Sequence, residues 1–228
     1  TETLTKRLRD RAAREEMRAR METGSDFENI TLLVGFENVI AIGLRTDEYR
    51  RFEGKSIAEI ALALGKDPYD ALFDLLAAEK CEAGMIDYIS DEEDLKAILR
   101  APFSGVISDA TYPGAGQVHP RVYGAFARLI ETYVVREKVL TLEQAVHKVT
   151  LQAAERFSLA GKGKIEAGAD ADLLLFAPEK IRERGTYLTP KACASGFDEV
   201  FVLGERVIEN GEYRGGSSGE MLGLRMEY

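Results

Sequence analysis

The chain has 228 residues, of which 45% are apolar and 30% are charged, and its 39 acidic against 30 basic side chains give a formal net charge of -9. This composition is typical of one or two globular domains and excludes a disordered chain. Excess acid argues against a nucleic-acid-binding surface, which would be basic. No apolar stretch approaches the roughly 18 residues that a membrane-spanning helix requires, so no membrane partner is expected.

The N-terminal region combines helix formers with basic charge. Residues 5–22 lack Gly and Pro and predict a helix, and seven of them are Lys or Arg. Because acidic side chains are interspersed, we expect a solvated helix that rests on another element, with an anion-binding arm as the alternative. The region has no apolar segment of a secretory leader, and Cys81 and Cys193 cannot form a disulfide framework, so we expect a cytoplasmic protein.

Strand and helix signals follow in chain order. The β-branched runs at 30–36 and 38–44 predict strands. Three helices then have start signals of the capping type. These signals are Ser56 with Glu59 (closed by Gly65), Asp67 before Pro68, and Ser90 with Glu93.

The middle of the chain predicts a buried strand over residues 103–109 that stops at Asp109, before a loop rich in Gly and Pro. A helix is expected over 122–137. A second helix is expected to begin at Thr141, where Gln144 completes a capping box. Its apolar face is predicted to comprise Leu142, Val146, Val149, Ala153 and Phe157, with His147 off that face and exposed.

From Gly161 onward the apolar period changes to two. Runs at 164–167, 171–177, 198–204 and 206–210 predict strands separated by turn signals, among them Asn210–Gly211. The sequence therefore predicts an antiparallel β module of about 65 residues that begins near residue 160.

Asp109 and the His119-Pro120-Arg121 tripeptide are the candidates for chemistry. A carboxylate at the end of a strand, followed by a long loop, lies where (β/α) barrels carry catalytic groups, although many strands end in Asp merely to begin a turn. Arg121 offers a planar fork for a carboxylate, and His119 beside it could orient a ligand. The alternative for Arg121 is an ordinary ion pair with one of the chain's many acids.

Histidine is scarce, which limits metal chemistry. His119 and His147 are the two in the chain, and the sequence has no HxH, HExxH or CxxC. Since a catalytic zinc takes about three protein ligands, the chain alone does not specify a histidine-rich zinc site.

Several segments together resemble the C-terminal portion of the D-aminoacylase (N-acyl-D-amino-acid deacylase) family of the amidohydrolase superfamily. They are GVISDA at 105–110, HPRVYGAFARLIETYV at 119–134, LTLEQAVHKVTLQAAERFSL at 140–159, GKGKIEAGADADLLLFAP at 161–178 and VFVLGERVIENGEYRG at 200–215. The SD pair followed by HPR is the most particular of these signals, whereas the segment at 161–178 is common across amidohydrolases.

The resemblance implies an α/β fold, made of the C-terminal part of a metal-dependent (β/α)8 barrel and a partial antiparallel β-sandwich. Residues 1–160 would form the partial barrel, with an insertion segment at about 1–88 and the last barrel strand and helices at about 89–160. Residues 161–228 would form the sandwich portion. The implied cofactor is zinc, with Asp109 as metal ligand and proton shuttle. Arg121 would receive the carboxylate of an N-acyl-D-amino acid, with His119 in the same substrate-binding loop.

The resemblance also implies what this chain lacks. The family's other metal ligands have no counterpart here, so we expect the chain to be inactive alone and to associate with a missing N-terminal half or another copy of itself. Two alternatives remain open. One is a hydantoinase-like amidohydrolase acting on a cyclic amide, which would not require Arg121, and the other is a non-catalytic interaction module that uses residues 5–22 as its contact surface.

Overall fold

The computed structural model describes residues 2–24, 26–110 and 118–222. The chain forms two compact units, each described below by itself. Unit 1 comprises Thr1–Ser90 and Thr111–His119, and unit 2 comprises Asp91–Ala110 and Pro120–Tyr228. Among the described helices, none is both long enough and apolar enough to cross a bilayer.

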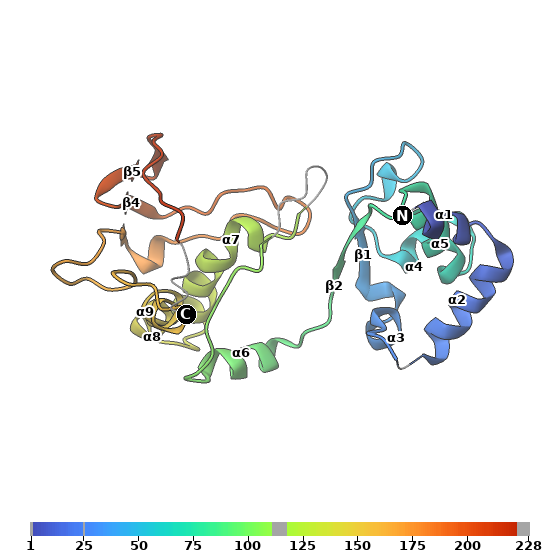
Figure 1. Ribbon diagram of the computed structural model, residues 1–228, viewed down its shortest axis with the longest axis horizontal. Helices are drawn as coiled ribbons and strands as arrows, with labels where there is room; N and C mark the ends of the chain where they lie inside the picture. Colours follow the sequence, from blue (N-terminus) through green and yellow to red (C-terminus); the bar gives the residue numbers. More distant parts are fainter. Residues whose placement is uncertain (1, 25, 111–117, 223–228) are drawn as a thin grey trace, which may run out of the picture. The chain divides into compact units, whose positions relative to one another are not determined.

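Unit 1 is a helical unit with a two-stranded sheet (Figure 1). Its elements are α1 (Glu2–Arg7), α2 (Arg11–Thr23), α3 (Ile30–Val34), η1 (Phe36–Asn38), β1 (Val39–Ile42), η2 (Arg50–Phe52), α4 (Ile57–Leu64), α5 (Pro68–Ala78) and β2 (Gly84–Asp87).

The helix starts in unit 1 follow the predicted local chemistry. The Ser56 side chain accepts from the Glu59 amide while the Glu59 carboxylate accepts from the Ser56 amide, which forms a complete capping box for α4. Gly65 ends that helix with φ of 62°, a left-handed conformation that glycine adopts without steric cost. Asp67 caps α5, and Pro68 occupies its first turn. These three predictions are confirmed.

The core of unit 1 lies where α4 and α5 pack and β1 joins them. β1 pairs antiparallel with β2, with Val39 opposite Asp87. Alternate residues of β1 are buried, as expected when one face of a strand is covered. Ile60 on α4 and Leu75 on α5 are 0% and 1% exposed in this cluster. Burying a side chain of this size contributes roughly 1.5–3 kcal/mol, so each of these two residues contributes clearly to the stability of unit 1.

Unit 2 joins helices to a four-stranded antiparallel sheet of order β3-β4-β5-β6. Its elements are α6 (Glu92–Arg100), α7 (Arg121–Arg128), the π-helix η3 (Leu129–Arg136), α8 (Leu142–Val149), α9 (Leu151–Arg156), β3 (Leu173–Phe176), η4 (Pro178–Lys180), β4 (Phe197–Val202), β5 (Glu205–Glu209) and β6 (Glu212–Tyr213).

Two-residue turns connect the last three strands. Leu203 and Gly204 join β4 to β5, and Asn210 and Gly211 join β5 to β6. All four residues have positive φ, the conformation of the hairpin turns whose twist matches that of paired strands. The antiparallel β module is therefore confirmed from β3 onward.

The structure corrects several element predictions. Residues 30–34 are the short helix α3 rather than a strand, because the Asn29 side chain accepts from the Leu32 amide and caps a helical turn. The helix at 5–22 is instead two helices, α1 and α2, the second beginning after its cap Asp10. Asp91 rather than Ser90 caps α6.

Further corrections concern unit 2. The helix expected from Thr141 keeps its capping box but breaks at Thr150 into α8 and α9. Residues 164–167 form no strand, since Gly163 and Gly168 on either side have positive φ and turn the chain. Residues 103–109 also form no strand, because the described residues supply no strand to pair with them. The α/β class is confirmed, while the sheets described here are antiparallel rather than the parallel strands of a barrel.

Candidate functional site

Asp109 lies at the end of an extended segment without regular secondary structure. From Ser104 to Ala110, half-buried and exposed residues alternate as they would in a strand. Phe103 and Ile107, on the exposed side of this alternation, are 87% and 75% exposed. Asp109 itself has φ of 46°, in the left-handed region that Asp tolerates better than most residues. The segment thus ends at a residue of left-handed backbone conformation, and its carboxylate is exposed.

An ion pair joins Asp109 to Arg121. The Arg121 Nη2 atom lies 2.7 Å from the Asp109 Oδ2 atom, and the two side chains are 40% and 70% exposed. Arg121 is the first residue of α7, after the buried Pro120. An exposed ion pair contributes only about 0–1 kcal/mol to stability, so this contact adds little to the stability of unit 2. Two of the three candidate residues therefore meet in unit 2.

His119 is placed differently from the other two candidates. It is the last residue of unit 1, is half-buried, and precedes Arg121 by two positions. His147, the other histidine, is exposed on α8, as predicted.

The donor set for a metal is incomplete. No group of three or more His, Cys, Asp or Glu side chains that could hold a metal ion occurs among the described residues. Asp109 offers a carboxylate oxygen, but a catalytic zinc takes about three protein ligands. The described residues therefore do not fit a complete zinc site, and Asp109 can serve as one ligand of a site at most.

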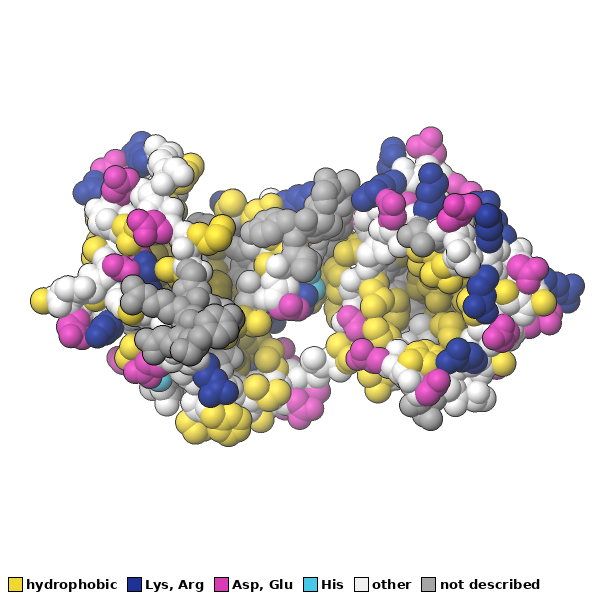
Figure 2. Space-filling model, in the orientation of Figure 1, with side chains coloured by type: hydrophobic (Ala, Val, Ile, Leu, Met, Phe, Trp, Pro, Cys, Tyr) yellow, Lys and Arg dark blue, Asp and Glu magenta, His cyan; other side chains and the backbone are white. Residues whose placement is uncertain are grey.

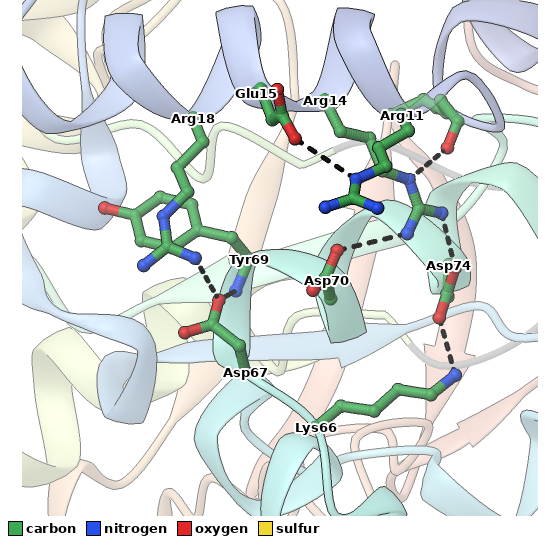
Figure 3. A network of polar contacts seen from close by, with 10 residues as sticks. Arg11, Arg14, Glu15, Arg18, Lys66, Asp67, Tyr69, Asp70 and Asp74 are labelled. Atoms are coloured by element: carbon green, nitrogen blue, oxygen red, sulfur yellow. Dashed lines mark hydrogen bonds and ion pairs between the residues drawn. The ribbon is translucent and has the colours of Figure 1, made fainter.

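Ion pairs join the basic helix α2 to α5 (Figure 3). Arg14 on α2 contacts Asp70 at 3.2 Å and also binds Asp74, which in turn accepts from the Lys66 ammonium at 2.6 Å. Burial raises the pKa of Asp74, but the hydrogen bonds from Lys66 and Arg14 outweigh burial and hold that pKa below its ordinary value. These contacts support the interpretation of a helix resting on another element over that of an anion-binding arm.

Lys148 was not a candidate from the sequence. The predicted apolar face of α8 included Val146, which is 37% exposed, whereas the buried positions are Ala145 and Lys148. Lys148 is 5% exposed and donates to the Ala101 and Ser104 carbonyls. The available signal was its spacing of three residues from Ala145, which places both side chains on one helix face.

Comparison with known proteins identifies the family. The profile described as "Amidohydrolase family" matches residues 40–186. An N-acyl-D-glutamate deacylase of Alcaligenes xylosoxydans xylosoxydans is 36% identical over 151 residues, which cover 66% of this chain and 30% of the relative. A D-aminoacylase of the same organism is 33% identical over 174 residues, covering 76% of this chain and 35% of the relative.

A solved structure agrees with these relatives. The N-acyl-D-glutamate deacylase of Bordetella bronchiseptica, complexed with zinc and a phosphonate that mimics the tetrahedral intermediate, superposes with a TM-score of 0.67 at 30% identity. The match covers 83% of this chain and 36% of that one, so the chain spans about a third of the length of the proteins it matches. Because the profile matches more than half of its residues, this chain belongs to the amidohydrolase family, and the relatives and solved structure described here are N-acyl-D-amino-acid deacylases.

Proposed function

We propose that the protein to which this chain belongs hydrolyses the amide bond of N-acyl-D-amino acids, and that the chain supplies the proton-shuttling and carboxylate-binding part of the active site. The observation that carries the proposal is the ion pair between Asp109 and Arg121. It joins, in a member of this family, the carboxylate and the guanidinium that such a reaction needs close together.

Arg121 is assigned to the substrate carboxylate. An N-acyl amino acid is an anion, and a guanidinium binds a carboxylate through two parallel hydrogen bonds that also fix its orientation. Arg121 is 40% exposed, so it remains reachable while it contacts Asp109. Its five N–H groups allow it to hold the substrate carboxylate and Asp109 together.

Asp109 is assigned to proton transfer and to one metal-ligand position. A carboxylate at this site can accept the proton of the attacking water and return it to the leaving amine nitrogen, a role that contributes roughly 10²–10⁴-fold to rate. In the zinc-bound relative, the metal is present with a mimic of the tetrahedral intermediate. Since the described residues of this chain do not complete such a site, we propose that its other ligands come from elsewhere in the intact protein and that the chain alone is inactive. His119, two positions before Arg121 in the sequence, is also proposed as a substrate-binding residue.

The surface of unit 2 supports association with a further part of the protein. Leu174 and Leu175 on the edge strand β3 are 56% and 62% exposed, and they point to opposite faces of the sheet. Figure 2 shows hydrophobic side chains at the surface of both units. Unpaired edges with apolar neighbours are sites where another chain segment adds. We propose that the remainder of a (β/α)8 barrel and β-sandwich covers this surface, or failing that a second copy of the chain.

The placement of the protein in the cell is also proposed. Cys81 and Cys193 are both free thiols. Free thiols are the usual state in a reducing compartment, which supports a cytoplasmic location.

The test is an assay of the full-length protein with N-acetyl-D-amino acids and their L enantiomers. We expect turnover of the D series, and a loss of roughly 10²–10⁴-fold in kcat for Asp109→Ala. Asp47→Ala is the matched control, because Asp47 is 99% exposed and lies in unit 1. Turnover that is unchanged in Asp109→Ala would remove this residue from the mechanism. Turnover of a neutral cyclic amide that N-acyl-D-amino acids fail to inhibit would favour the hydantoinase-like alternative.

A further inference from the structure

Lys148 is a buried cation without a carboxylate partner among the described residues. Its residue exposure is 5%, and burial lowers the pKa of its ammonium group. Burying a charge is unfavourable unless its hydrogen bonds are satisfied. Lys148 Nζ meets that need with three acceptors, the Ala101 carbonyl at 2.6 Å, the Ser104 carbonyl at 2.8 Å and the Ser104 hydroxyl at 3.0 Å.

These acceptors lie at the C-terminal end of α6. Ala101 is the C-cap of that helix, and the Ser104 hydroxyl approaches the Ile98 carbonyl at 2.6 Å. Carbonyls at a helix C-terminus lack partners within the helix and carry partial negative charge, so an ammonium is favoured there. Lys148 therefore holds residues 101–104 against α8 through these hydrogen bonds.

Residues 101–104 lead into the segment that ends at Asp109. From Gly105 to Ser108, the backbone makes no hydrogen bond to another element among the described residues, and Val106 packs against the core of unit 2. The next polar contact along the chain is the Asp109–Arg121 pair. Polar contacts thus hold the segment at its first residues through Lys148 and Gln152, and at its last through Arg121. Loosening the first anchor would let the carboxylate of Asp109 sample positions away from the guanidinium.

We propose that Lys148 is a positioning residue, which holds residues 101–104 so that the segment delivers the Asp109 carboxylate to its place beside Arg121. The catalytic consequence rests on the proposed function, whereas the anchoring of the segment does not. A general contribution to folding would affect the whole of unit 2, but positioning acts through Asp109. The two roles can therefore be separated.

The catalytic test uses Lys148→Met in the full-length protein, at a temperature where the variant is folded. We expect kcat to fall roughly 10- to 100-fold with KM almost unchanged, because the reacting group is misplaced rather than the substrate released. Lys191→Met, which removes an exposed lysine of unit 2, should change neither constant. In an Asp109→Ala background, Lys148→Met should cause no further loss. A full additional loss in that background, or a rise in KM alone, would overturn the proposal.

A second variant perturbs the same contacts less and is therefore less disruptive to folding. Ser104→Ala keeps the ammonium but removes one of its acceptors, and we expect kcat to fall about 2- to 10-fold. The proposed role would be contradicted if kcat were unchanged in Lys148→Met or in Ser104→Ala.

The structural test does not depend on turnover. Hydrogen exchange of the Ala101 and Ser104 amides, which donate to the Ile98 and Ala101 carbonyls, should be at least about 10-fold faster in Lys148→Met than in the parent protein, with exchange in unit 1 unchanged. Equal exchange in the two proteins would overturn the anchoring. If the parent protein shows no turnover of any N-acyl-D-amino acid, the proposed function fails, and this exchange measurement still decides whether Lys148 fixes the segment.

Discussion

The two units differ in how far each covers its own sheet. In unit 1, alternate residues of β1 are buried, and Ile60 and Leu75 close the core beside it. In unit 2, every residue of the four strands β3, β4, β5 and β6 is half-buried or exposed. The sheet of unit 2 is therefore less covered than that of unit 1, although Phe176 and Phe197 pack against the core of unit 2.

The two units also differ in what their arginine side chains contact. Arg14 of unit 1 connects α2 to Asp70 and Asp74, and this network links helices that pack together. Arg121 of unit 2 instead holds the exposed carboxylate of Asp109, at the end of a segment without strand partners. Arg14 thus joins packed helices, whereas Arg121 makes a partly exposed ion pair, and the proposed function assigns it to the substrate carboxylate.

Truncating one apolar side chain in each unit tests the difference most strongly. Ile60→Ala should lower the free energy of unfolding of unit 1 by about 2–5 kcal/mol, because it leaves a cavity in a fully buried site. Leu174→Ala should cost at most about 0.5 kcal/mol in this chain, since that side chain is 56% exposed. Urea denaturation followed by hydrogen exchange of α4 and β4 measures both. If both variants lowered the free energy of unfolding equally, the two units would not differ in how well their apolar side chains are covered. A larger loss for Leu174→Ala in the full-length protein would show that this face of β3 is covered there.

Replacing one arginine in each unit separates structural from ligand-binding charge. Arg121→Lys in the full-length protein should raise KM for N-acetyl-D-amino acids roughly 10- to 100-fold, because lysine cannot form the two parallel hydrogen bonds. Arg14→Lys should leave KM unchanged and weaken the link between α2 and α5. Steady-state kinetics give KM for both variants. An unaltered KM in Arg121→Lys would show that Arg121 does not bind the substrate carboxylate.

Acid should destabilise unit 1 through Glu79. Burial raises the pKa of this carboxyl, but hydrogen bonds from the Thr46 hydroxyl and from the Arg45 and Thr46 amides outweigh burial and lower it below its ordinary value. Because the folded-state pKa is the lower one, the stabilisation is present above the unfolded-state pKa of about 4.3 and is lost as the pH falls through the folded-state value. Glu79→Gln should cost about 1–3 kcal/mol at pH 7 and weaken the acid sensitivity of unit 1.

Denaturation of unit 1 between pH 3 and pH 7 measures this dependence. Glu48→Gln, at an exposed glutamate of the same unit, is the control and should keep the parent's profile. If Glu79→Gln also kept that profile, another carboxyl would be responsible for acid lability.

Removing a helix cap should have the smallest effect and should not distinguish the units. Ser56 of α4 and Thr141 of α8 both complete capping boxes. Ser56→Ala and Thr141→Ala should each cost about 1 kcal/mol, because a cap is a local interaction that does not depend on what covers the rest of the unit. Thermal denaturation of each variant tests this. A much larger cost in one unit would mean that its cap also holds a tertiary contact.

The sequence determined what depends on neighbours along the chain. Capping boxes at Ser56 and Thr141, the left-handed Gly65 and the Asn210–Gly211 turn were all predictable, because each is decided within a few residues. Asp109 and Arg121 were each predictable as a candidate, but the sequence named no partner for the ion pair that Arg121 forms.

Tertiary structure decided what depends on partners distant in sequence. Residues 103–109 have the alternation of a strand but form none, since a strand exists only when another pairs with it and the described residues supply no such partner. Lys148 was missed for a related reason: nothing in the sequence of α8 shows that the carbonyls of Ala101 and Ser104, more than 40 positions earlier, would accept its ammonium. Local hydrogen bonds are encoded locally, whereas burial of a strand or a charge is settled only by the elements that come to lie against it.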